Sequence, residues 1–141
     1  MIGEWIESSQ EVSLAATQAK LDHTAWAASA SYVLTGEDTG FRGVAKPSRP
    51  FGTGPDSGWG ALEIVLRATE LDVDDAAFAG FANPATQASS AFTYAAGLNW
   101  YVTTNAKFML NYTLTSFEGG AAGGADRADE KGILARFQLN Y

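Results

Sequence analysis

The chain has 141 residues, a formal net charge of −7 and no cysteine. Its nine basic residues are scattered, which excludes nucleic acid as the expected partner, because phosphate binding requires clustered Lys and Arg. The absence of cysteine excludes a disulfide framework, a thiolate nucleophile and a Cys-based zinc site.

Alternation typical of a strand begins weakly at the amino terminus. Residues 2–12 favour a first strand, but the pattern does not distinguish its two faces. Glu4 and Glu7 stand where a secretory signal would carry a basic stretch followed by an apolar one. If the protein is exported, we therefore expect its amino-terminal part to lie outside this chain.

Five later segments alternate with a period of two, so each presents one apolar face and one polar face. The apolar positions, which we call the apolar rows, are Trp26, Ala28, Ala30, Tyr32 and Leu34, then Leu62, Ile64, Leu66 and Ala68, then Phe92, Tyr94, Ala96, Leu98, Trp100 and Val102, then Phe108, Leu110, Tyr112 and Leu114, and finally Ile133, Ala135, Phe137, Leu139 and Tyr141. With residues 2–12 the chain thus predicts six strands of about ten residues, the length that crosses a bilayer when tilted, whereas no apolar run reaches the ~18 residues of a membrane helix.

A helical alternative exists for two segments. Residues 13–30 are rich in alanine, and residues 61–71 consist largely of good helix formers. The alternation at 61–71 is broken only by Val65, and the neighbouring segments obey the period of two. We therefore predict strands there, and an all-β antiparallel fold.

The connections differ in length in a way that is typical of a transmembrane β-barrel. Segments 72–91 and 117–131 are long and polar or rich in glycine, whereas 104–107 is short enough for a hairpin turn. Barrels of the outer membrane alternate long external loops with short periplasmic turns. Segment 36–58 departs from this rule. The alternation of external and periplasmic connections along the chain makes it periplasmic, but it is long.

Residues for catalysis are not arranged in a recognisable pattern. Asp72, Asp74 and Asp75 lack the turn glycine and the distal glutamate of a calcium loop, and a solvated loop is the better interpretation. His23 has no Ser and Asp arrangement that resembles a triad. We predict no enzyme activity, no cofactor and no metal site.

The polar faces of the strands carry the remaining functional candidates. In a barrel they line a water-filled lumen, and in a one-sided soluble sheet they face bulk solvent. The predicted pore-lining residues are Glu63, Arg67, Thr69, Asn99, Tyr101, Asn111, Thr113, Arg136, Gln138 and Asn140.

Aromatic residues fall near predicted strand ends or in apolar rows, as in the aromatic girdles of membrane proteins. The alternative is that they form the core of a soluble sandwich. The predicted girdle residues are Trp26, Tyr32, Trp59, Phe92, Trp100, Tyr112, Phe137 and Tyr141.

Four runs of residues together resemble a known family. They are YVLTGE at 32–37, GWGALEIVLRATELDV at 58–73, GLNWYVTTNAKFMLNY at 97–112 and ARFQLNY at 135–141. In this order they are similar to the carboxy-terminal region of the phosphate-selective porin O and P family.

The resemblance implies a sixteen-stranded barrel that forms homotrimers in the bacterial outer membrane and passes phosphate or other anions. It also implies that selectivity lies mainly in earlier strands and an inward-folded loop, whereas Arg67 and Arg136 match lumen-facing places. The terminal Phe137, Leu139 and Tyr141 resemble the signal that the outer-membrane assembly machinery reads, with Tyr141 in place of the commoner Phe.

Two functions follow from these patterns. In the first, the chain is the carboxy-terminal portion, about six strands, of a porin barrel for passive diffusion of small hydrophilic solutes. Its partners would then be outer-membrane lipid and the remaining amino-terminal strands, because porins need ~16–18 strands to enclose a channel. In the alternative, the chain is a soluble all-β sandwich that binds a ligand at its loops.

Overall fold

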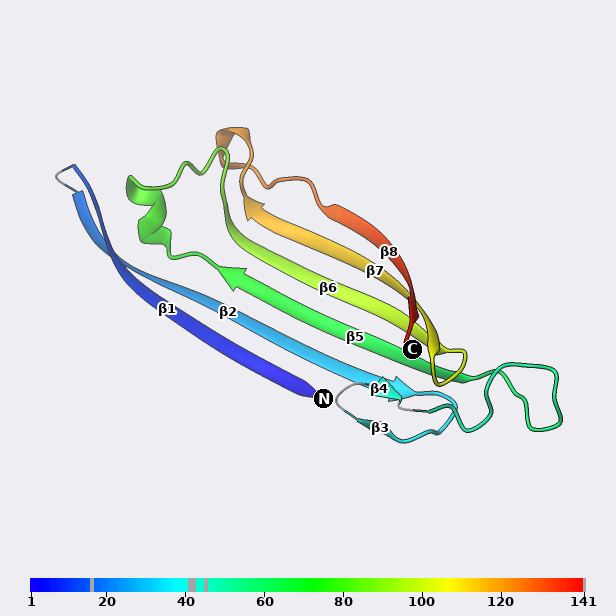
Figure 1. Ribbon diagram of the computed structural model, residues 1–141. Coiled ribbons are helices and arrows are strands. Elements are labelled where there is room, and N and C mark those ends of the chain that lie inside the picture. Colours follow the sequence, from blue (N-terminus) through cyan, green and yellow to red (C-terminus); the bar gives the residue numbers. More distant parts are fainter. Residues whose placement is uncertain (16, 41–42, 45, 141) are drawn as a thin grey trace. The chain divides into compact units, whose positions relative to one another are not determined.

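The computed structural model describes residues 1–15, 17–40, 43–44 and 46–140, and these residues form an all-β structure. One sheet has six strands in the order β1-β2-β5-β6-β7-β8, so strands that follow one another along the chain lie side by side (Figure 1). Its strands are β1 (Ile2–Leu14), β2 (Thr17–Val33), β5 (Ala61–Asp72), β6 (Ala88–Tyr101), β7 (Ala106–Gly119) and β8 (Glu130–Leu139). The prediction of a six-stranded antiparallel sheet is confirmed.

Short elements occupy the longer connections. Between β2 and β5 lies a small antiparallel ribbon of β3 (Thr39–Gly40) and β4 (Gly43–Val44). Short 3-10 helices follow β5 and β7, namely η1 (Asp75–Ala79) and η2 (Ala122–Gly124). In the described residues no helix is long and apolar enough to cross a membrane.

The strands are longer than the alternation alone predicted, most of all at the first hairpin. β2 begins at Thr17, and its ladder with β1 runs from Ile2↔Ser29 to Leu14↔Thr17. Ala15 follows β1 at φ 53, a left-handed conformation that tight hairpins require. Sequence alternation missed residues 17–25 because backbone pairing continues there through polar residues such as Lys20, which lies opposite Glu11. The helical alternative for 13–30 is wrong.

The sheet is open in the part of the chain that the structure describes. β1 and β8 stand at its two ends, so each is an edge strand. The only other sheet there is the β3–β4 ribbon, with two residues in each strand. The sandwich alternative requires two extended sheets packed face to face, and the described residues do not form them.

The chain divides into two compact units, which we call unit 1 and unit 2. Unit 1 comprises Met1–Ser29, Arg67–Tyr94 and Leu114–Lys131, and unit 2 comprises Ala30–Leu66, Ala95–Thr113 and Gly132–Tyr141. In unit 1, Leu21 of β2 and Ala77 of η1 are buried. In unit 2, the buried cluster consists of Val33, Val44, Ala61 and Tyr101, which brings the β3–β4 ribbon onto the sheet.

Candidate functional site

A buried carboxylate lies on the polar face of unit 2. The hydroxyl of Tyr101 donates a hydrogen bond to Glu63 Oε2 at 2.7 Å, and the side-chain amide of Asn99 donates to the same oxygen at 3.0 Å. Glu63 is only 3% exposed and Tyr101 only 5%. The carboxylate is therefore shielded from bulk water. Hydrogen bonds from two neutral donors offset part of the free-energy cost of its desolvation.

The alternation of the strands places these three side chains together. Glu63 stands on β5, and Asn99 and Tyr101 stand two residues apart on the neighbouring β6, so both donors point to one face. Gly60, at φ 75, comes so close to β6 that a Cβ there would overlap the Tyr101 carbonyl oxygen. Lys107 adds a positive charge, its ammonium lying 5.2 Å from the centre of the Tyr101 ring.

The other predicted pore-lining residues form no single cluster. Gln138 donates to Asn140 at 3.0 Å, Asn111 lies against Gly97, and Thr113 lies against Gly132. Thr69 is half-buried, and Arg67 and Arg136 are exposed. Within the described residues neither arginine takes part in a salt bridge.

Large side chains of the apolar rows are exposed, whereas the middle of the polar face in unit 2 is covered. Leu98 is 41% exposed, Leu110 52% and Leu139 63%, in contrast to the nearly inaccessible Glu63 and Tyr101. A water-soluble protein shows the opposite distribution, since it buries its apolar side chains and seldom exposes a large apolar patch. An apolar environment suits this face better than water does.

The comparison with known protein families agrees with this distribution. The model of the family described as phosphate-selective porin O and P matches residues 5–141. This chain belongs to that porin family. The family predicted from four sequence runs is thereby confirmed, and it is a family of channels rather than of enzymes.

Comparison with one relative shows how much of a longer protein this chain matches. The porin chain is 34% identical over 92 residues to an uncharacterized protein of Caulobacter vibrioides (strain ATCC 19089 / CIP 103742 / CB 15). These residues are 62% of this chain and 16% of that protein, so the chain spans a small part of the length of the curated relative that it matches. No solved structure matches the chain.

Aromatic side chains of this porin form a continuous series in unit 2. Trp59 and Trp100 both contact Phe51, with ring centres 6.5 and 5.4 Å apart, and Phe108 stacks on Trp100 at 5.8 Å and on Phe137 at 4.5 Å. Phe51 is not among the predicted girdle residues, because it lies in a connection rich in Pro and Gly rather than in an alternating strand.

The remaining predicted girdle residues are distributed differently. In unit 1 the rings of Trp26 and Phe92 lie 6.1 Å apart, and the Trp26 indole donates to Glu70 Oε2 at 2.7 Å. Tyr32 and Tyr112 are exposed. Tyr141 lies outside the described residues. Indole nitrogens that find a polar partner beside an apolar ring are typical of membrane–water interfaces.

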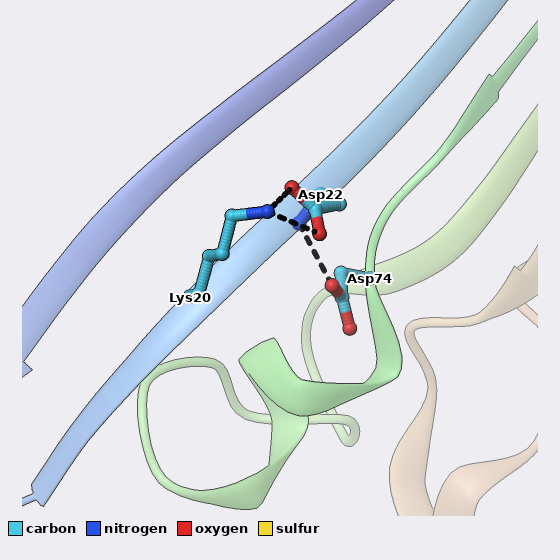
Figure 2. A network of polar contacts seen from close by, with 3 residues as sticks. All are labelled: Lys20, Asp22 and Asp74. Atoms are coloured by element: carbon cyan, nitrogen blue, oxygen red, sulfur yellow. Dashed lines mark hydrogen bonds and ion pairs between the residues drawn. The ribbon is translucent and has the colours of Figure 1, made fainter.

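A second polar network lies in unit 1 and includes Asp74, which the sequence placed in a solvated loop. Asp74 Oδ2 accepts from the Asp22 backbone N–H at 2.7 Å, and Asp74 Oδ1 caps η1 by accepting from the Ala76 N–H at 2.8 Å. Figure 2 shows Asp74 reaching β2, where Lys20 pairs with Asp22. These two N–H donors hold the pKa of Asp74 below its usual value of 3.8.

The single histidine belongs to the same network. The backbone N–H of Asp74 donates to His23 Nδ1 at 3.2 Å, and His23 Nε2 lies 3.3 Å from the Gln10 amide nitrogen. Periodicity could not predict these contacts, because β2 and the segment after β5 are about fifty residues apart in the sequence. Their effect is to fasten the 73–80 segment to β2.

Proposed function

We propose that this chain forms part of the wall of an outer-membrane porin through which small hydrophilic solutes diffuse passively, anions such as phosphate among them. The proposal rests on the reversed distribution of side chains, with exposed apolar rows on one face of the sheet and polar residues on the other, in a chain of a porin family. In a barrel wall the first face meets lipid and the second lines the lumen.

The open sheet fits the same proposal. Edge strands with unpaired backbone groups are not tolerated in lipid, so β1 and β8 would pair with strands that complete the barrel. We propose that the complete protein is a bacterial outer-membrane homotrimer, with the short connection 104–107 on the periplasmic side, where short turns of such barrels lie.

Reconstitution tests the channel directly. The complete porin, inserted into planar bilayers, should give stepwise conductance with ions and small sugars as permeants. A protein that folds and inserts but gives no steps above those of empty bilayers would contradict the proposal.

Charge on the polar face sets the expectation for selectivity. Arg67 and Arg136 are proposed to favour anions, because an outward-pointing guanidinium would meet hydrocarbon at a cost of ~2–4 kcal/mol near the midplane. Reversal potentials under a salt gradient should shift toward cations in the Arg67→Gln, Arg136→Gln double variant. If the anion-to-cation ratio does not change, the two arginines line the wall without setting what passes.

A further inference from the structure

The buried carboxylate of Glu63 is unusual for a residue on the polar face of a pore wall. A lumen-facing carboxylate would normally keep its water, and burial of a charge is costly even when hydrogen bonds compensate for it. Glu63 is nevertheless 3% exposed, with Tyr101 and Asn99 as its donors. The question is therefore which part of the chain covers Glu63, and what that part does.

Part of this cover comes from the β3–β4 ribbon. A Cβ at Gly43 would overlap the Tyr101 hydroxyl and would lie 3.6 Å from Glu63 Oε2. Gly43 also has φ 88, which disfavours any residue with a side chain. Val44 is buried with Val33, Ala61 and Tyr101. Gly43 and Val44 thus rest directly on the phenol that binds Glu63.

Further contacts fasten the chain on both sides of the ribbon. Glu37 Oε1 accepts from the Ser48 N–H at 3.1 Å, so it ties the start of the connection to its middle. The Phe51 N–H donates to the carbonyl oxygen of Val102 at 2.8 Å, which ties the connection to the end of β6. The described parts of the long connection are thus held by hydrogen bonds within the connection and to the chain that follows β6.

We propose that Glu63, acting through Tyr101, is the residue that positions Gly43 and Val44 over the polar face of unit 2, and that this pair narrows the pore where it lies. The proposal rests on the proposed porin function for the narrowing, but not for the positioning. Glu63 is a positioning residue here, because its carboxylate is 3% exposed and is bound by Tyr101 and Asn99 rather than offered to the solute path.

Two variants of the complete porin test the contact. Tyr101→Phe removes the hydroxyl that joins Glu63 to the ribbon, and Gly43→Ala places a methyl group where that hydroxyl lies. Each should make amide hydrogen exchange of the peptide covering 36–58 about tenfold faster, because local opening becomes easier. Each should also raise single-channel conductance, by about 1.5-fold, because the narrowest part of a pore governs conduction.

Gly36→Ala is the matched control. Gly36 has φ 85, almost the value at Gly43, but a Cβ there meets nothing within 4 Å. It carries the same backbone strain without the overlap, so its exchange and conductance should change much less than those of Gly43→Ala. In the Tyr101→Phe background, Gly43→Ala should add less than it does alone, since the atom it would overlap is gone.

The outcomes separate the two proposals. Equal exchange rates in wild type, Tyr101→Phe and Gly43→Ala would overturn the positioning role, whatever the conductance. Faster exchange with unchanged conductance would overturn the narrowing. A wild-type protein that does not conduct would contradict the porin function, and the exchange rates would still decide the positioning role. Should Gly43→Ala fail to fold, Tyr101→Phe, which removes one oxygen atom, decides alone.

Discussion

Leu110 shows at the scale of a single residue what the exposed apolar rows imply. Its side chain is 52% exposed, and its strand places polar Asn111 on the other face. Replacing Leu110 by Arg in the complete porin should cost ~2–4 kcal/mol if the residue lies near the bilayer midplane. Urea unfolding in lipid vesicles measures this, with Gln138→Arg on the polar face as the control. Equal costs for the two variants would place Leu110 away from lipid.

Asp74 gives a pH dependence at the same scale. Because its pKa in the folded protein lies below the usual 3.8, ionised Asp74 stabilises the 73–80 segment above that value. This contribution is lost as the pH falls below 3.8 and through the folded pKa. We expect the Ala76 and Ala77 amide resonances to shift in this range in the wild type and to lose the shift in Asp74→Ala. In Asp75→Asn the Ala76 and Ala77 amide resonances should still shift as in the wild type, since Asp75 makes no side-chain hydrogen bond among the described residues.

At the scale of the elements, Gly60 and Gly97 both lie close to a neighbouring strand, but against different kinds of atom. A Cβ at Gly60 would overlap the Tyr101 carbonyl oxygen of β6, which is backbone, whereas a Cβ at Gly97 would overlap the Asn111 side-chain oxygen, which can rotate away. Gly60 also has φ 75, which by itself costs an alanine roughly 1–2 kcal/mol. Gly60→Ala should therefore lower the unfolding midpoint clearly more than Gly97→Ala. The reverse order would mean that the β5–β6 end is not held as tightly as these contacts indicate.

The whole chain, taken alone, carries two features that water does not favour. Its apolar rows are exposed, and β1 and β8 have unpaired edges. We expect the isolated 141 residues neither to fold stably in detergent-free buffer nor to conduct in bilayers. Far-ultraviolet circular dichroism during heating measures the first part. A cooperative melt would show that the sheet is stable without the rest of a barrel.

The local pattern of the sequence was sufficient for the strands and the family. Alternation at residues such as Leu98 and Asn99 depends only on the two-residue period of a strand, and the order of the four family-like runs is a property of the chain itself. Even the hydrogen-bonded pair Gln138 and Asn140 lies on one predicted polar face. The ends of the strands could not be predicted as well, because backbone pairing continues through polar residues, as it does at Lys20.

Only the tertiary structure decided which polar residues are covered. The sequence placed Glu63 and Arg67 alike on the polar face of one strand, yet Glu63 is buried beside Gly43, Asn99 and Tyr101 while Arg67 is exposed. Likewise, Asp74 and His23 meet although about fifty residues separate them. Such contacts depend on where a long connection returns to the sheet, and loop closure costs too little per added residue for sequence length to fix that place. The periodicity of a strand fixes which way a side chain points, and the path of a distant segment decides what it meets.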